Sequence, residues 1–261
     1  MSDDVIRVCV GCTDSHWLAV KVLEHSIRCR TTARVEVHSM HEWELHQNCP
    51  IPHSRKNRPV TEFSFQRFLP PEHFGFEGKA IYLDSDQVVM GDIAELWNTP
   101  MNGAHVLKCP GWQSAVMLID CAVGWRIAKL VRQLDMGKRS YTGMMNLKDV
   151  GIVREGLDPY WNYMDRGRTD YSDWERAKLI HYTNMNTQPW LKRGHQLAAP
   201  WNLELLTAIQ FGFISRDDLM REIELRHVRP SLAAIIKEEP PYPDQEFVFP
   251  DDTFKGVGLH R

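Results

Sequence analysis

Short apolar runs alternate with amphipathic segments over most of the chain, and the runs have the length of buried strands. Strands are predicted over residues 5–10, 34–38, 80–83, 88–90, 104–108 and 113–120. Helices are predicted from the turn at residues 11–15 to about residue 28, and over residues 63–70, 123–134, 141–147, 201–211 and 217–226. This alternation predicts an α/β fold, in which a mixed, mostly parallel sheet is flanked by helices.

The first strand, the turn and the first helix form the opening unit of the predicted sheet. Asp14 or Ser15 in the turn can cap the helix that follows. Open α/β sheets bind ligands beyond the carboxyl ends of their strands. We therefore expect Thr13, Asp14 and the turn backbone either to meet a ligand there or, in the case of Asp14, to act as a helix cap.

Two stretches lack a clear period. Residues 38–59 hold four His, one Cys and three Pro, and they are predicted to form an exposed loop at the ligand-binding rim. From about residue 237 the chain becomes rich in proline and acidic residues, which predicts a tail with little structure of its own. The predicted organisation is one domain over residues 1–236, with its last helices at about 201–229, and an extended tail over 237–261.

Composition excludes several functional classes. A chain of 261 residues with 43% apolar residues, 25% charged residues and a net charge of −3 is typical of a globular protein and offers no basic patch for nucleic acid. No apolar stretch predicts a membrane span, and the acidic N-terminus does not resemble a signal peptide. The six scattered cysteines then predict reduced thiols and a cytoplasmic location. Cys9 and Cys12 have CxxC spacing but lack a second pair.

The tripeptide Asp84-Ser85-Asp86 follows the apolar run at residues 80–83. Side chains two positions apart on an extended chain point the same way, so the two carboxylates would converge and repel each other. A hard divalent cation, Mg²⁺ or Mn²⁺, commonly offsets such repulsion and brings a diphosphate with it. The alternative is a simple turn between two strands.

The sequence around this tripeptide resembles a known family. Ile-Tyr-Leu-Asp-Ser-Asp (residues 81–86) followed by Gly-Asp-Ile-x-x-Leu-Trp (residues 91–97) is similar to the metal-binding region of the retaining family-8 glycosyltransferases, which include glycogenin. A second segment, from His181 to Trp190, resembles the family's His-x-x-Gly-x-x-Lys-Pro-Trp. The resemblance implies a GT-A nucleotide-diphospho-sugar transferase fold and a cation held by Asp84, Asp86 and His181. An imidazole ligand favours Mn²⁺, with Mg²⁺ as the alternative.

The resemblance also implies which residues contact the nucleotide sugar. The turn after the first strand would bind base and ribose, an arginine ahead of the metal site would reach the donor, and the start of the strand at 113–120 would line the sugar pocket. The implied donor-binding residues are Gly11, Thr13, Asp14, His16, Arg67, Ser85, Ser114, Asn184 and Gln188. Asn184 stands where relatives have glycine, and Asn tolerates positive φ.

Two departures from the family pattern concern charge. Relatives carry an Asp-Gln-Asp helix start below the anomeric carbon, whereas this chain has Tyr141, Thr142 and Gly143. A double displacement through a carboxylate at that point is therefore not expected. Two alternatives remain: Gln113 contributes as the catalytic residue, or the leaving group departs within an ion pair. Gln188 replaces a lysine, so a positive charge is lost near the diphosphate. Arg67, Lys192 or Arg193 can offset that loss.

The resemblance implies a metal-dependent retaining glycosyltransferase that moves a sugar from a nucleotide-diphosphate donor, expected to be a UDP-sugar, to a saccharide or another hydroxyl acceptor. The missing carboxylates favour an alternative, a catalytically inactive protein that binds sugar nucleotides or glycans. A nucleotidyltransferase is less well supported, because the turn after the first strand lacks a glycine-rich basic loop.

Overall fold

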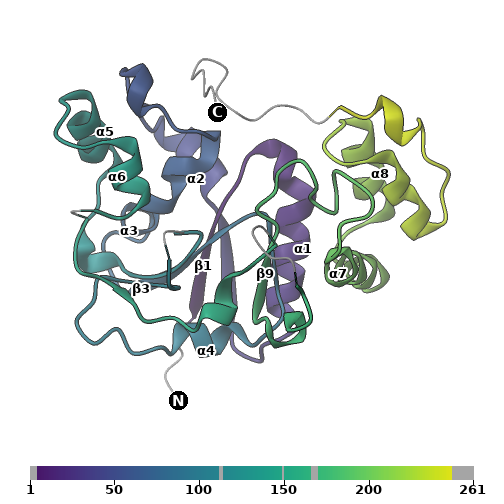
Figure 1. Ribbon diagram of the computed structural model, residues 1–261, viewed down its shortest axis with the longest axis horizontal. Helices are drawn as coiled ribbons and strands as arrows, with labels where there is room; N and C mark the ends of the chain where they lie inside the picture. The colour runs from purple at the N-terminus through teal and green to yellow at the C-terminus, as the bar shows by residue number, and fades with distance from the viewer. Residues whose placement is uncertain (1–4, 112–113, 149, 166–169, 249–261) are drawn as a thin grey trace.

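A six-stranded mixed sheet forms the centre of the molecule (Figure 1). The computed structural model describes residues 5–111, 114–148, 150–165 and 170–248. In spatial order the strands are β2 (Val35–Ser39), β1 (Ile6–Gly11), β3 (Lys79–Asp84), β6 (Val116–Asp120), β5 (Val106–Lys108) and β7 (Val153–Glu155). Pairing is parallel for β2–β1, β1–β3 and β5–β7, and β6 runs antiparallel to both its neighbours. The predicted α/β fold with a mixed, mostly parallel sheet is confirmed.

The central strands are buried on both faces over most of their length, which explains the unbroken apolar runs at residues 8–10 and 80–83. Cys9 and Val10 of β1 point to opposite faces, as do Tyr82 and Leu83 of β3, and none of the four has exposed surface. Parallel strands covered on both sides need apolar side chains at every position rather than at alternate ones. This requirement fixes β1 and β3 side by side at the centre, with their carboxyl ends at one edge of the sheet.

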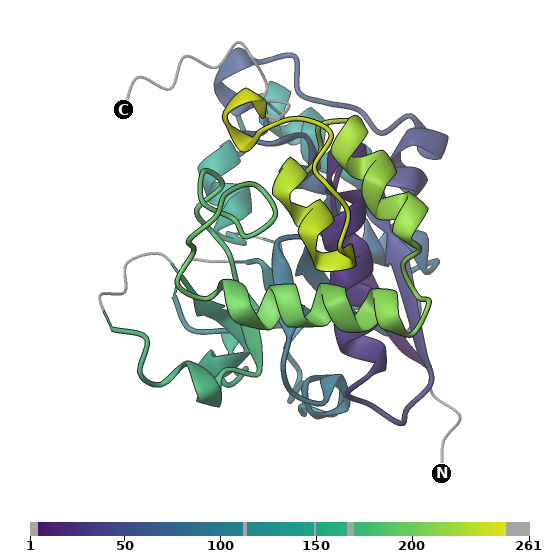
Figure 2. The same ribbon diagram turned by 90° about the vertical axis from the view of Figure 1, so that its right-hand side faces the viewer.

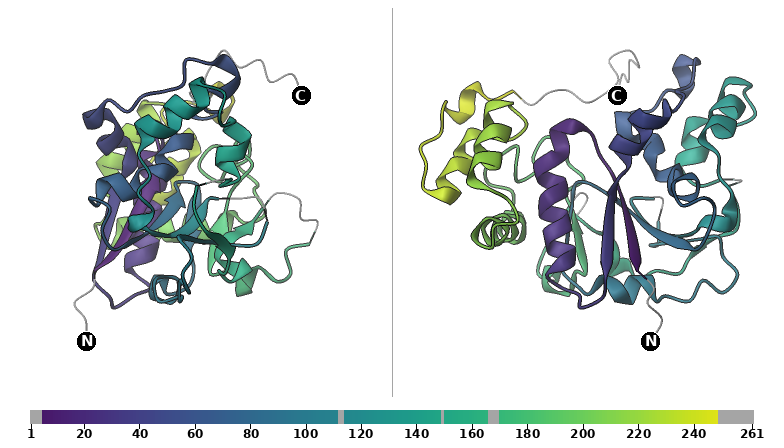
Figure 3. Two further views of the ribbon diagram at one scale, coloured as in Figure 1. Left: turned by 90° about the vertical axis from the view of Figure 1, so that its left-hand side faces the viewer. Right: turned by 180° about the vertical axis from the view of Figure 1, so that it is seen from behind.

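Helices cover both faces of the sheet. Helix α1 (Trp17–Arg28) lies on one face, and α7 (Ala198–Gln210) and α8 (Arg216–Glu224) pack outside it, as Figure 2 shows from their side. The other face carries α2 (Met40–Gln47), α3 (Pro70–His73), α5 (Ile127–Asp135) and α6 (Tyr141–Met145), which lie opposite α1 in Figure 3. The short α4 (Ile93–Trp97) begins at Asp92, whose side chain accepts a hydrogen bond from the Ala94 amide.

A second, three-stranded sheet brings distant parts of the chain together. Its order is β4 (Gln87–Val89), β9 (Leu179–His181) and β8 (Tyr163–Met164). Strands β4 and β9 are antiparallel, with Gln87 opposite His181. Because Gln87 directly follows the Asp84-Ser85-Asp86 tripeptide, this register puts His181 beside the two carboxylates.

The prediction of a loop over residues 38–59 was wrong in part. Residues 40–47 form α2, although they lack an amphipathic period. Tertiary contacts explain the helix: Met40 is fully buried in the core, and the Glu44 carboxylate accepts a hydrogen bond from the buried Gln66 amide at 2.8 Å. The helix ends at Asn48, which adopts the left-handed conformation with φ 47°.

Several other boundaries differ from prediction. Residues 62–68 form a 3-10 helix, Glu62–Phe68, and a helix was predicted over 63–70. Helix α5 begins at Ile127 rather than 123, because Asp120 caps a 3-10 turn that Gly124 ends in the left-handed region, φ 68°. Strand β7 was not predicted. The strand predicted over 113–120 is β6, Val116–Asp120. Gln113 lies outside the described residues.

Capping of α1 by Asp14 or Ser15 was also wrong. Asp14 and Ser15 belong to a 3-10 turn, Asp14–His16, that runs directly into α1. No side-chain hydrogen bond caps the N-terminus of the turn or that of α1. The His16 amide donates instead to the Thr13 carbonyl at 3.0 Å. The turn is therefore closed by backbone, which leaves the Asp14 carboxylate 89% exposed.

Residues 238–248 run back along the C-terminal helices. The Tyr242 hydroxyl donates to the Ile223 carbonyl of α8 at 2.8 Å, and Asp244 accepts from the Ser231 amide at 2.9 Å and pairs with Arg193 at 2.7 Å. None of the helices in the described part of the chain combines the length and apolar character that a membrane crossing requires.

Candidate active site

Two carboxylates and one imidazole meet where β3 and β9 end. Asp84, Asp86 and His181 each offer a ligand atom, and these atoms all lie within 4.8 Å of one another. Asp84 is 7% exposed and His181 is 3% exposed. Carboxylates this close to each other and this far from water repel strongly unless positive charge lies between them.

Asp86 faces His181 with a buried carboxylate oxygen that lacks a hydrogen-bond donor among the described residues. Asp86 Oδ1 lies 3.1 Å from His181 Nε2, yet it is buried without a hydrogen bond of acceptable geometry among the described residues. The other oxygen, Oδ2, accepts from the Gln188 amide at 3.3 Å, and the same amide donates to the Tyr182 carbonyl at 2.9 Å. A buried carboxylate oxygen without a donor, directed at a ring nitrogen, fits a divalent cation.

Asn162 sets the orientation of the imidazole. Its Oδ1 lies 2.8 Å from His181 Nδ1. An amide oxygen can only accept, so Nδ1 carries the proton and Nε2 presents a lone pair toward Asp86. Burial is the largest influence on the pKa of His181 and lowers it, but the charge and hydrogen bond of Asp86 together with the charges of Asp84 and Asp165 outweigh it, so the net direction is a raised pKa. The Nε2 position thus attracts a proton or a metal ion.

Asp84 is held by a tyrosine and an arginine. The Tyr82 hydroxyl donates to Oδ1 at 2.8 Å, and the Arg67 guanidinium lies 3.3 Å from the same oxygen. Burial raises the pKa of Asp84, with Arg67 opposing the rise and Asp86 adding to it. Arg67 also donates to Ser114 Oγ at 2.6 Å, so one guanidinium joins a candidate metal ligand to a candidate sugar contact.

Gly11 makes room for the tyrosine. A Cβ at this position would overlap the Tyr82 hydroxyl. The backbone of Gly11 is also bonded to the site, since its carbonyl accepts from the Ser85 amide at 3.0 Å. Glycine is therefore needed for close approach, and its lack of a side chain lets Tyr82 reach Asp84.

Gly11→Ala should lower the free energy of unfolding by about 1–3 kcal/mol, the usual cost of overpacking. The cost should be smaller in a Tyr82→Phe background, because the atom that clashes most has been removed. Urea unfolding of the two single variants and the double variant measures this difference. An equal cost in both backgrounds would show that Tyr82 is not the cause.

Of the turn residues predicted to bind the nucleotide, His16 lies beside the acidic tripeptide, whereas Thr13 and Asp14 line another part of the surface. His16 is buried, its Nδ1 lies 3.2 Å from Ser85 Oγ, and its ring packs edge-on against Phe63. Thr13 and Asp14 line a separate hollow of about 260 Å³. The Asp14 carboxylate lies 3.2 Å from His41 Nε2.

A pocket of about 450 Å³ opens in front of the three candidate ligands. Its wall is lined by the 3-10 helix at 62–68, by α6 and by the segment after β9. The lining residues that concern the argument are Arg67, Ser114, Tyr141, Thr142, Asn146 and Thr183. Asn184 lies on an exposed turn next to this wall and does not adopt positive φ. Among the predicted compensating charges, Arg193 pairs with Asp244 instead.

Sequence reasoning missed two residues that hold the ligands in place. Tyr82 donates to Asp84, and Asn162 fixes His181. Tyr82 lies in the Ile-Tyr-Leu-Asp-Ser-Asp motif and Asn162 ends the segment Leu-Asp-Pro-Tyr-Trp-Asn, residues 157–162, so each stood within a recognisable motif without an assigned role.

Asn162→Ala should weaken Mn²⁺ binding by ~10- to 100-fold, the usual cost of losing a partner that orients a metal-ligating histidine. Asn162→Asp keeps an acceptor for Nδ1 and should retain most of the affinity. Titration of each variant with Mn²⁺, following the electron paramagnetic resonance signal of the free ion, measures the difference. Equal affinity for wild type and Asn162→Ala would remove Asn162 from this role.

Comparisons with known proteins agree with this geometry. Residues 8–116 match the model of Glycosyl transferase family 8. Protein CDI of Arabidopsis thaliana is 34% identical over 90 residues, which is 34% of this chain and 35% of the relative. Glycosyltransferase 8 domain-containing protein 1 of Danio rerio is 43% identical over 104 residues, which is 40% of this chain and 26% of the relative. The matched segment thus spans about a third or less of each relative.

Solved structures share the fold at low identity. The bifunctional glycosyltransferase WbbM superposes with a TM-score of 0.60 at 13% identity, over 78% of this chain and 50% of the other. The galactosyltransferase LgtC superposes with a TM-score of 0.55 at 14% identity, over 77% and 96%. At such identities the likeness establishes the GT-A fold alone. The sequence match to the model of glycosyl transferase family 8 covers residues 8–116, which include β1, β3 and the Asp84-Ser85-Asp86 tripeptide.

Proposed function

We propose that the protein transfers a sugar from a nucleotide-diphosphate donor, a UDP-sugar, to a hydroxyl of a saccharide or another acceptor, with retention at the anomeric carbon and dependence on a divalent cation. The observation that carries this proposal is the convergence of Asp84, Asp86 and His181 in front of a pocket large enough for a sugar. The match of residues 8–116 to the model of glycosyl transferase family 8 supports it.

The three candidate metal ligands fit a cation of intermediate hardness. Two carboxylates and one imidazole suit Mn²⁺ better than Mg²⁺, which prefers oxygen and water. Asp84, Asp86 and His181 would hold the ion. When bound, it supplies positive charge to a diphosphate leaving group. Tyr82 and Asn162 keep two of the ligands oriented before the donor arrives.

The chain's own polar groups would orient the sugar beside the diphosphate. Arg67 and Ser114 are hydrogen-bonded to each other and both line the pocket next to Asp84. We infer that they contact the donor, where the guanidinium offers the only side-chain cation among the described lining residues. The hydrogen bond from Ser114 to the Met145 carbonyl, 3.0 Å, fixes the hydroxyl against α6.

A second candidate function, binding of a sugar nucleotide without transfer, is favoured by one observation. Apart from Asp84 and Asp86, the described lining of the pocket contains no carboxylate, and Tyr141 and Thr142 occupy the wall formed by α6. A nucleophilic carboxylate would therefore have to come from outside these residues.

A turnover assay separates the two candidates. The full chain, freed of metal and then given Mn²⁺, is incubated with a panel of UDP-sugars and acceptor saccharides, and released UDP is measured. Mn²⁺-dependent release with one donor is the expected result. Donor-induced stabilisation in a thermal melt, without release from any donor, would favour the binding protein. Neither stabilisation nor release with any donor would contradict both.

A further inference from the structure

We propose that His25, Cys29 and Glu204 form a second metal site that takes a thiophilic divalent cation such as Zn²⁺. The site lies between α1 and α7, outside the pocket described above. It goes beyond the proposed function, because nothing in glycosyl transfer requires it.

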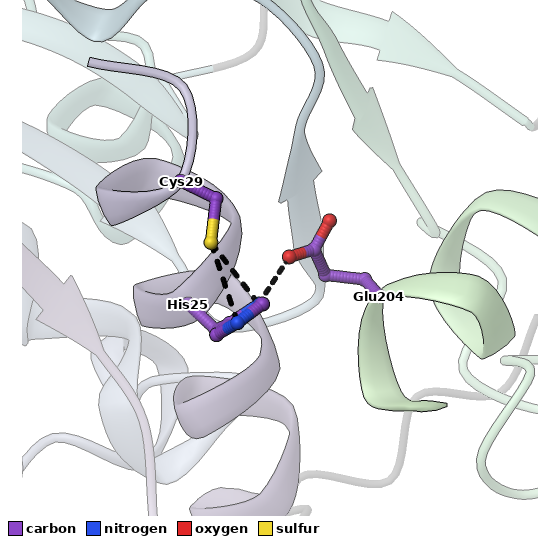
Figure 4. A group of neighbouring side chains, drawn as sticks. All are labelled: His25, Cys29 and Glu204. Atoms are coloured by element: carbon purple, nitrogen blue, oxygen red, sulfur yellow. Dashed lines mark hydrogen bonds and ion pairs between the residues drawn. The ribbon is translucent and has the colours of Figure 1, made fainter. Parts of the chain in front are cut away.

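The three side chains converge from two helices (Figure 4). His25 and Cys29 lie four residues apart at the end of α1, so they lie on one face of the helix. Glu204 reaches across from α7 and its Oε1 is hydrogen-bonded to His25 Nδ1. One ligand atom from each of the three lies within 4.8 Å of the others.

The spacing is close to that of a tetrahedral zinc site. Cys29 Sγ lies 3.8 Å from His25 Nδ1 and 3.3 Å from Nε2. Ligands ~2.0–2.3 Å from zinc at tetrahedral angles are roughly 3.3–3.8 Å apart. The contact between His25 and Glu204 is shorter than this spacing and must open to admit the ion.

The burial of Glu204 and its ion pair with Arg30 suit a role as a metal ligand. Glu204 and His25 are each 4% exposed. Arg30 pairs with Oε2 of the glutamate at 2.7 Å, while Oε1 is directed at the imidazole. Carboxylates that bind a metal through one oxygen commonly have the other held by such a partner. Cys29 is exposed, so an ion can enter and a water can complete its coordination.

The same three residue types could instead make a thiol nucleophile, but the surroundings oppose it. Burial first, and then the Glu204 carboxylate, raise the pKa of Cys29. Cys29 is also the residue at the C-terminal end of α1, where the helix dipole disfavours a thiolate. Reactive cysteines need the opposite environment. A divalent cation would supply the positive charge that this environment lacks.

The two metal sites are far enough apart to be tested separately. His16, which contacts Ser85 of the acidic tripeptide, precedes α1, and His25 lies nine positions later. At 1.5 Å per residue the separation along the helix is roughly 13 Å. An ion at one site therefore shares no ligand with the other.

Cobalt is the probe, because a cysteine ligand gives Co²⁺ a thiolate charge-transfer absorption that oxygen and nitrogen ligands do not. The full chain, metal-free and kept reduced with a phosphine, should show this absorption on titration with Co²⁺, and Zn²⁺ should abolish it by competition. Cys29→Ser should eliminate the absorption, whereas Cys49→Ser, a matched control elsewhere in the chain, should keep it. Asp86→Ala should keep it too, which separates this test from that of the proposed function.

The proposal is overturned if the wild type shows no such absorption at millimolar Co²⁺, or if Cys29→Ser retains it. Loss of the absorption in Asp86→Ala would also overturn it, because the two sites would not be independent. In an Asp86→Ala background, which lacks the first metal site, Zn²⁺ should in addition raise the melting temperature, since the ion joins α1 to α7, and it should not do so in the Asp86→Ala/Cys29→Ser double variant. Cys29 is exposed, so serine at this position leaves the fold intact for the comparison.

Discussion

Asp86→Ala should abolish Mn²⁺-dependent binding of the nucleotide-sugar donor, with a loss in Mn²⁺ affinity of at least ~100-fold, since even an outer partner of a ligand costs 10- to 100-fold. Asp86 is the residue that joins the other parts of the site. Its two oxygens lie 3.1 Å from His181 and 3.3 Å from Gln188. Without it, one carboxylate and an imidazole remain, and neither the charge nor the geometry for a divalent cation is kept.

Calorimetric titration with Mn²⁺, and then with UDP in the presence of Mn²⁺, measures the effect. Asp217→Ala is the matched control, because Asp217 is an exposed carboxylate in the first turn of α8. It removes the same charge and should leave both affinities unchanged. If Asp86→Ala binds Mn²⁺ and UDP as the wild type does, the proposed metal site is rejected.

His181→Ala should weaken Mn²⁺ binding far more than Tyr141→Phe does. Both residues line the same pocket. His181 Nε2 carries a lone pair directed at the candidate ion, because the Nδ1–H group donates a hydrogen bond to Asn162 Oδ1. The Tyr141 hydroxyl, by contrast, donates a hydrogen bond to Ser64 Oγ and accepts one from the Val60 amide, each at 3.2 Å. Its removal alters the pocket wall and leaves the ligand set complete.

The free-ion signal of Mn²⁺ in electron paramagnetic resonance gives both affinities under one condition. His181 is 3% exposed, so its truncation also creates a cavity, and urea unfolding of the two variants is needed to show that each is folded during the titration. Similar losses of affinity in both variants would mean that the cation lies elsewhere in the pocket and that His181 is a packed residue.

The sequence by itself was sufficient for those parts of the molecule that local chemistry governs. Buried strands need apolar side chains on both faces, so β1 and β3 could be recognised from the apolar runs at residues 8–10 and 80–83. The spacing of Asp84 and Asp86 predicted that the two carboxylates converge, as they do, because side chains alternate along an extended chain. Asp92 could be recognised as the N-cap of α4, since its carboxylate accepts a hydrogen bond from the backbone amide two residues later.

Residues 40–47 show where local chemistry is insufficient. Their polar and apolar positions follow no helical period, so the sequence predicted a loop, and α2 exists because Met40 is buried and Glu44 meets Gln66. The capping prediction for Asp14 failed for a related reason: backbone bonds close the turn, and the carboxylate contacts His41 from α2 instead. In both places, partners distant in the sequence outweigh local preference.

The active site itself depends on contacts of this second kind. The pairing of Gln87 with His181 across β4 and β9 places the imidazole beside the two aspartates, and a shift by one residue would turn His181 to the other face. Gly11 beside Tyr82, and Asn162 beside His181, are likewise contacts between separate segments. The sequence thus determined which groups could bind a cation. Only the register of the folded strands decided that they meet, because strand pairing is set by the packing of the whole sheet and not by the residues next to each ligand.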